Sequence, residues 1–174
     1  MNRPEIISEL TCNYKLFTDF TSSLDNREFL FAPTGKWTAS QQLDHLIRAV
    51  SPLSAGLQLP KFAVRLLFGK SNRPSESYEE LVGKYLSKLE MGGKAFGRFI
   101  PLKIAPEDKQ RNIEKLLKRV KQLGANINTY SEQQLDTFIL PHPLLGKVTL
   151  REMMYFTIYH AEHHLKQAIK NAGK

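Results

Sequence analysis

The chain has 174 residues, of which 41% are hydrophobic and 24% are charged. A chain of about 150 residues buries roughly 70% of its unfolded surface, so this length predicts one domain over residues 1–174 with a core of its own. The composition excludes a disordered chain, a mini-protein held by disulfides and a collagen-like repeat.

Hydropathy and cysteine content also restrict the class of protein. A membrane span needs about 20 apolar residues, whereas the run from Phe62 to Phe68 is short and contains Arg65. The first residues lack the apolar run of a signal peptide, so we expect a cytoplasmic protein without a membrane partner. Cys12 has no second cysteine to pair with, and we expect it to be a small buried hydrophobe within a helix.

The net charge of +8 is concentrated in the middle of the chain, where residues 59–121 carry 15 basic and 7 acidic side chains. One interpretation is a patch for nucleic acid or another polyanion. The other is that the basic residues between Lys109 and Lys121 cover the solvent side of a helix. No aromatic residues alternate with these bases and no nucleic-acid-binding motif is present, so we do not expect a nucleic-acid partner.

Apolar spacing predicts two long helices in the first third of the chain. The first covers residues 4–24 and ends at Asp25-Asn26. The second begins at the capping box of Thr38 and Gln41, runs to Leu57 and should bend at Pro52. Their apolar faces contain Ile6, Leu10, Tyr14, Phe17 and Leu24 in the first helix, and Leu43, Leu46, Ile47, Val50, Leu53 and Leu57 in the second.

The stretch 58–105 is the least regular, with a short amphipathic piece at 61–68 and a helix from Ser77 to Gly92-Gly93. A third long helix opens at Pro106, because proline and acidic residues suit a first helical turn. Its core stripe contains Ile113, Leu116, Leu117, Val120, Leu123 and Ile127.

The segment 136–146 is apolar with two prolines, and we expect a packed loop there. A second capping box, Thr149 with Glu152, opens the last helix, which runs to Ala172. Four long amphipathic helices without a convincing pair of strands predict an all-α four-helix bundle.

Five histidines carry the chemical signal of the sequence. His160 and His164 lie four residues apart, so on a helix they share one face, and that face is apolar. Buried imidazoles need a partner for their nitrogens, which a metal ion, water or a tyrosine hydroxyl could supply. His45 borders the apolar face of the second helix and is the natural third ligand. Three ligands with an open position are typical of catalytic metal sites.

Other interpretations of these histidines stay open from spacing alone. All three could be ordinary core or surface residues, and His163 competes with His164 as a partner of His160. His142, between two prolines, is expected to be a loop residue. The zincin motif, the Glu-x-x-His motif of di-iron bundles, Gly-x-Ser-x-Gly and phosphate-binding glycine loops are absent.

Three motifs together resemble the DinB-like superfamily. Residues 37–46 (WTASQQLDHL) resemble its tryptophan-to-His-Leu start of the second helix, and residues 143–149 (PLLGKVT) resemble its Pro-x-x-Gly-x-x-Thr approach to the last helix. Residues 160–167 (HAEHHLKQ) are similar to its His-x-x-His-His-x-x-Gln helix. The motifs agree in order and helix placement over roughly residues 1–172.

The resemblance implies an up-down-down-up four-helix bundle with a long crossover between the second and third long helices. It implies a divalent metal ion, zinc or nickel, bound by His45, His160 and His164 with water in the open positions. Characterised relatives include S-transferases and isomerases that use low-molecular-weight thiols, and relatives are often dimers, so a homodimer is expected. Asp44, Tyr155 and Tyr159 are candidate outer-shell groups.

Three functional hypotheses follow. The first is a metal-dependent enzyme that transfers a small thiol to an electrophile or hydrolyses a small molecule, since a Lewis-acidic ion makes a nucleophile of bound thiol or water. The second is a non-enzymatic ligand-binding or stress-response bundle. The third is a basic protein associated with nucleic acid.

Overall fold

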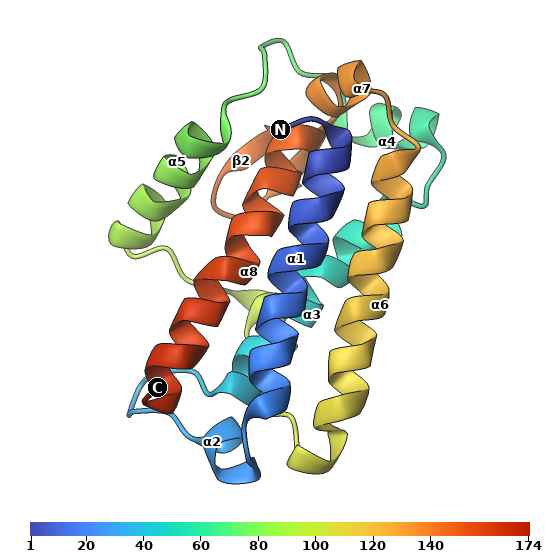
Figure 1. Ribbon diagram of the computed structural model, residues 1–174. Helices are drawn as coiled ribbons and strands as arrows, with labels where there is room; N and C mark the ends of the chain where they lie inside the picture. The colour runs from blue at the N-terminus through green and yellow to red at the C-terminus, as the bar shows by residue number, and fades with distance from the viewer.

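The computed structural model describes all residues from 1 to 174. Its four long helices are α1 (Arg3–Ser23), α3 (Ala39–Gly56), α6 (Lys109–Asn128) and α8 (Leu150–Ala172). Both α1 and α3 pack against α6 and α8, so the four helices surround one core (Figure 1). The α1 and α8 helices run in one direction, and α3 and α6 run in the other (Figure 1). The expectation of an all-α fold is therefore confirmed, apart from one small sheet.

Capping boxes define where the two site-bearing helices begin. The Thr38 hydroxyl accepts from the Gln41 amide N–H at the start of α3, and Thr149 accepts from Glu152 in the same way at the start of α8. Each cap satisfies amide donors that the first helical turn leaves free. Both predicted starts are confirmed, and α3 continues through Pro52 to Gly56.

Several short elements join the long helices. The expected pieces at 61–68 and after Ser77 are α4 (Lys61–Phe68) and α5 (Tyr78–Glu90). The sequence interpretation missed α2 (Asn26–Leu30), because Asp25 does not only end α1 but also caps this next helix. The remaining elements are the 3-10 turns η1 (Gly97–Phe99) and η2 (Pro106–Asp108) and the helix α7 (Glu132–Thr137).

The expected loop at 136–146 was wrong, because part of it forms an antiparallel hairpin of β1 (Ile139–His142) and β2 (Gly146–Thr149). The ring nitrogen Nδ1 of His142 accepts from the amides of Leu144 and Leu145 at 3.2 and 3.0 Å, which closes the turn. Pro141, the one proline within these strands, is tolerated because each strand of a two-stranded sheet has an outer edge. The hairpin connects α7 to α8 and helps to cover the bundle.

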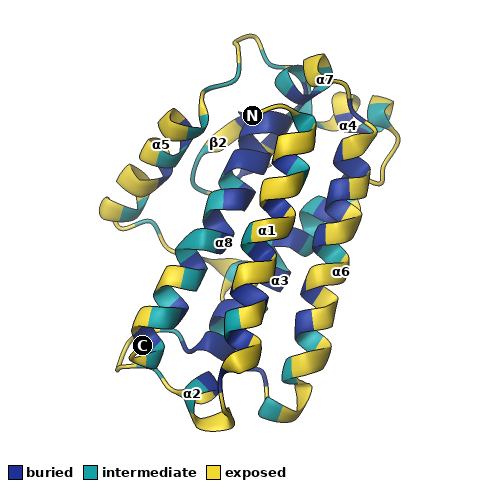
Figure 2. Ribbon diagram, viewed as in Figure 1, coloured by how far each residue is buried: buried dark blue, intermediate teal, exposed yellow.

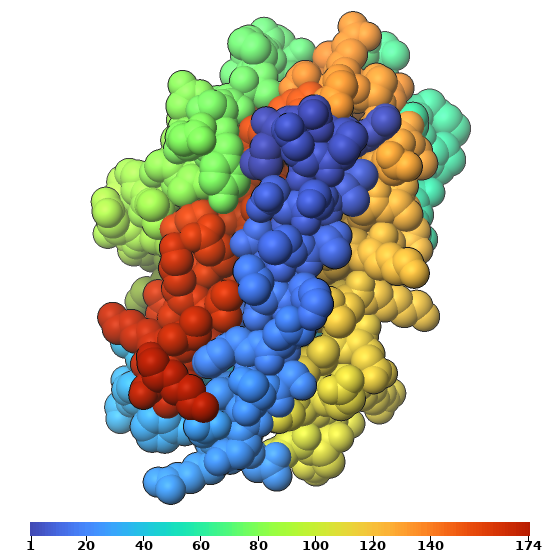
Figure 3. Space-filling view, viewed as in Figure 1, coloured from blue at the N-terminus to red at the C-terminus, as the bar shows by residue number.

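The core lies between the four long helices, whose inner faces are buried along their length (Figure 2). Side chains of α1 fill the space between α8 and α6 on the face shown in Figure 3. Two expectations fail here. Cys12 is exposed, since it lies two residues from both Leu10 and Tyr14 and hence on the opposite side of α1. Leu117 is also 37% exposed, at the edge of the α6 stripe.

Most basic side chains of α6 face solvent, as the second of the two interpretations of the net charge predicted. Arg111, Lys115, Lys118 and Lys121 are exposed. Lys109 is different, because its ammonium group donates to the Leu24 carbonyl at 2.6 Å. No helix of the structure has the length and hydropathy of a membrane-crossing segment.

A buried carboxylate links the crossover to the start of α8. Glu152 is fully buried, and it accepts from the Arg73 guanidinium at 2.9 Å and from the amide N–H groups of Glu76 and Thr149 at 2.8 and 2.7 Å. Its two oxygens are therefore satisfied by donors from two distant segments. This link holds the chain just before α5, and α5 packs on α8 (Figure 1).

We expect Glu152→Gln to lower the free energy of unfolding by about 2 kcal/mol, because the variant leaves the Arg73 charge without its anionic partner. The loss is smaller than for a fully buried pair, since the Arg73 side chain is 41% exposed and can reach water. Urea unfolding at neutral pH measures the effect. The matched control is Glu162→Gln, which breaks an exposed pair with Lys166 and should cost less than about 0.5 kcal/mol. Equal losses in the two variants would contradict the structural role of Glu152.

Candidate metal centre

Three histidines from two neighbouring helices meet inside the bundle. His45 comes from α3, and His160 and His164 come from successive turns of α8. The Nε2 atom of His160 lies 3.1 Å from that of His45 and 2.9 Å from that of His164. The side chains are only 4 to 6% exposed. The structure therefore brings together the three residues that the sequence singled out.

Two of the three rings are oriented by a hydrogen bond at their second nitrogen, Nδ1. The Nδ1 of His45 lies 2.8 Å from the Phe99 carbonyl oxygen, and the Nδ1 of His164 is hydrogen-bonded to the side-chain oxygen of Gln42. Both oxygens can only accept, so both Nδ1 atoms must carry the proton. The Nε2 atoms of His45 and His164 consequently present lone pairs to one point next to His160. The Nδ1 of His160 is buried without a partner.

The cluster fits a transition-metal ion in spacing and in donor chemistry. Two nitrogens bound at about 2.0–2.1 Å to one ion at tetrahedral angles would lie about 3.4 Å apart. The observed separations of 2.9 and 3.1 Å are close to this value. Among the groups of the chain, a proton on His160 Nε2 is the one that can relieve the repulsion between these lone pairs. The three histidines could therefore hold a metal ion.

Burial keeps the three imidazoles neutral. Burial lowers the pKa of His45, and it lowers the pKa values of His160 and His164 well below the ordinary value. The charges that neighbouring histidines would carry lower the last two further. Neutral imidazole is the form that binds metal ions. The three rings are thus neutral at neutral pH, as a metal ion would require of its imidazole ligands.

Comparison with known proteins agrees with this geometry. The model of the DinB superfamily matches residues 9–168, which is most of the chain. The protein belongs to the DinB superfamily. A search of curated proteins found no significant match to this chain.

A cavity of about 830 Å³ borders the histidines of this DinB protein. Its walls come from α3, α8, the hairpin and the segment between α5 and η1. Trp37 covers one side of the metal centre, with its ring 5.0 Å from the His45 ring and stacked at 6.1 Å on His164. From α1, Tyr14 lines the cavity, and its buried hydroxyl has no hydrogen-bond partner. The histidines are therefore shielded from bulk water on one side and open to the cavity on the other.

The two other histidines lie outside the three-histidine cluster. His163 is half-buried and faces Tyr85, with 6.2 Å between ring centroids. It lines the cavity but is not part of the three-histidine cluster, so His164 is the partner of His160. His142 is buried at the end of β1, where it closes the hairpin turn instead of lying in a free loop.

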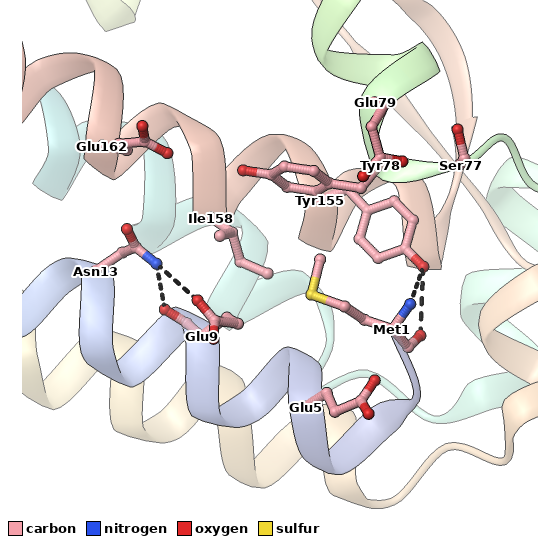
Figure 4. A pocket seen from close by; sticks show the side chains of 10 residues that line it. All are labelled: Met1, Glu5, Glu9, Asn13, Ser77, Tyr78, Glu79, Tyr155, Ile158 and Glu162. Atoms are coloured by element: carbon pink, nitrogen blue, oxygen red, sulfur yellow. Dashed lines mark hydrogen bonds between the residues drawn. The ribbon is translucent and has the colours of Figure 1, made fainter.

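None of the three candidate outer-shell groups forms a hydrogen bond with the histidines, which agrees with the alternative that they are surface or packing residues. Asp44 accepts from Arg48, and Tyr159 lies against His163. Tyr155 contacts Met1 in a separate, acidic pocket of about 490 Å³ between α1, α8 and the start of α5 (Figure 4). The lining of that pocket includes Glu5, Glu9, Glu79 and Glu162.

The true orienting groups are Gln42 and the Phe99 carbonyl, and sequence reasoning missed both. Gln42 could have been found, because it is a polar residue three positions before His45 on the inner face of the same helix. The Phe99 carbonyl leaves no signal in the sequence, since every residue has one and only the fold brings this one to α3.

We expect the metal-free protein to lose stability as pH falls from 7.5 to 5.5. Burial lowers the pKa of all five histidines below the ordinary 6.5, to about 4 for His142. The unfolded chain therefore takes up more protons below pH 6.5 than the folded chain does. Each fully buried histidine should cost about 1.4 kcal/mol over this interval. Urea unfolding at the two pH values, in the presence of a chelator, measures the loss.

The variant His142→Asn supplies the control. The Asn side-chain oxygen can still accept from the amides of the turn, but it does not titrate, so the pH-dependent loss should shrink by about one histidine's share. Stability that is equal at pH 7.5 and 5.5 would contradict the neutral, buried state of these rings.

Proposed function

We propose that this protein binds a divalent metal ion, zinc or nickel, on His45, His160 and His164 and acts as a metal-dependent enzyme. The observation that carries the proposal is the convergence of three imidazole Nε2 atoms in a buried site beside a cavity. Membership of the DinB superfamily supports it. We also propose the family's bundle topology, which the helix directions in Figure 1 support. With residues 57–108 as the crossover, those directions correspond to the up-down-down-up bundle.

The reaction that suits this site is transfer of a small thiol to an electrophile, or hydrolysis of a small molecule. A bound divalent ion would supply Lewis acidity, which lowers the pKa of a coordinated thiol or water. The protein contributes the positions of the three ligands, set by Gln42 and Phe99, and the cover that Trp37 provides. The cavity lies where a substrate could approach the open side of the site.

Metal analysis tests the ligand assignment. We expect the protein purified without chelator to bind about one zinc or nickel ion per chain, and His160→Ala to weaken binding more than 100-fold, because two ligands from separate helices remain. Competition with a chromophoric chelator measures the affinity. His163→Ala is the matched control, since it removes the adjacent imidazole that the structure leaves outside the cluster.

The metal affinity of Gln42→Leu should lie between those of these two variants. We expect it to be 10- to 100-fold weaker than in the unaltered protein, because the substitution removes only the hydrogen bond that orients His164. Gln167→Leu is its control, since Gln167 lines the same cavity without a hydrogen bond to a histidine. If His160→Ala binds the metal as tightly as the unaltered protein, the assignment of ligands is wrong.

One feature favours a second candidate, a ligand-binding bundle without catalysis. No Asp or Glu lines the cavity, so no carboxylate is available there as a general base. The enzyme proposal predicts that the zinc- or nickel-loaded protein conjugates a small thiol with a monochlorobimane-type probe, and that His160→Ala does not. Fluorescence of the conjugate measures turnover. Tight metal binding with no turnover for any thiol would favour the binding bundle instead.

A further inference from the structure

The charged side chains that line the cavity beside the candidate metal centre are all positive. None of its lining residues is Asp or Glu, whereas Lys36, Lys94 and Arg98 all belong to its wall. The three cations are exposed and form no ion pair within the chain. They are therefore available to a ligand that enters from solvent. An anion in the cavity would be attracted electrostatically by all three cations, and no carboxylate in the wall would repel it.

The one acidic residue next to a ligand in sequence is already neutralised. Asp44 precedes His45, but its carboxylate accepts from Arg48 Nε at 2.5 Å and from the Leu102 amide at 2.7 Å. Asp44 is not among the residues that line the cavity. The positive field of the cavity is therefore not cancelled by this carboxylate.

Two of the cations in the cavity wall directly precede, in sequence, a residue that contacts a histidine of the site. Lys36 precedes Trp37, whose ring stacks on His164. Arg98 precedes Phe99, whose carbonyl oxygen accepts from His45. The Arg98 guanidinium lies 5.1 Å from the centre of the Phe99 ring. Both cations are thus one residue away from a group that contacts a histidine of the site.

The rest of the wall is largely apolar. Half of the 34 lining residues are hydrophobic, and they come from several elements. Val50 and Leu53 belong to α3, Phe68 to α4, and Met153 and Phe156 to α8. A volume of about 830 Å³ lies within the range of pockets that hold small organic molecules. Such a wall favours a ligand with a sizeable apolar body, because its burial removes apolar surface from water.

We propose that the cavity binds an organic anion with a large apolar body. Its anionic group lies at the metal-centre end, near Lys36 and Arg98, and its apolar part lies along the wall formed by Val50, Leu53 and Phe68. This inference deepens the proposed function, and it rests on that function in taking this cavity as the substrate site. It predicts that cationic molecules bind this cavity more weakly than anions of similar size.

A pair of fluorescent probes tests the inference. The anion 1-anilinonaphthalene-8-sulfonate and the neutral N-phenyl-1-naphthylamine share one aromatic scaffold and differ by the sulfonate. We expect the metal-free protein to bind one sulfonate probe per chain, at least 10-fold more tightly than the neutral probe. Fluorescence titration gives the affinities, and calorimetry gives the stoichiometry. Metal-free protein is used so that the result does not depend on the metal.

Charge reversal at the cavity provides the decisive comparison. Lys36→Glu with Arg98→Glu should weaken binding of the sulfonate probe at least 10-fold and leave the neutral probe unchanged. The control is Lys115→Glu with Lys118→Glu, which makes the same change in net charge on the exposed side of α6. Circular dichroism checks that both double variants remain folded.

Each outcome has a defined meaning. Equal binding of the two probes, or equal weakening by the two double variants, would overturn the inference, because probe binding would then depend on exposed apolar surface or on net charge alone. Sulfonate binding that survives in His160→Ala supports the inference even if metal binding or turnover fails. Failure of probe binding in a protein that binds metal tightly would overturn the inference and leave the metal site intact.

Discussion

The central constraint on this DinB protein is the burial of three imidazole rings whose Nε2 atoms converge. Two imidazoles are held by oxygen acceptors at Nδ1, so their Nε2 lone pairs must point toward the third ring. In water such lone pairs would be solvated, but here the side chains are only 4 to 6% exposed. Burying unpaired polar atoms costs free energy. A cation bound by the three Nε2 atoms would offset this cost with three bonds.

The remainder of the fold keeps these rings in place. Capping boxes at Thr38 and Thr149 define the starts of α3 and α8, and the two helices pack against each other. The buried Glu152 holds the crossover against the beginning of α8. Packing of α5 on α8 and the contact of η1 with α3 then complete one side of the cavity. The helix α8 therefore carries both the buried Glu152 and two histidines of the candidate metal centre.

The basic side chains of the protein fall into two sets that differ in position. Most basic side chains of α6 face solvent, and none of them lines the cavity. A smaller set at the cavity, Lys36, Lys94 and Arg98, stands in a wall without carboxylates. Net charge by itself could not distinguish these two sets, because it does not report position. The cavity set is the one with consequences for ligand choice.

Local patterns in the sequence determined the helices, their caps and the pair of His160 and His164, because helix geometry places residues four apart on one face. They failed at α2 and at the hairpin, where neighbouring residues allowed more than one local structure. The expected burial of Cys12 was also wrong, although its spacing from Leu10 and Tyr14 places it on the outer side of α1. Only the tertiary structure decided that His45 meets this pair, that Gln42 and the Phe99 carbonyl orient the rings, and that Lys36 and Arg98 share one cavity. These are contacts between segments far apart in sequence, and they arise from helix packing, which no local spacing encodes.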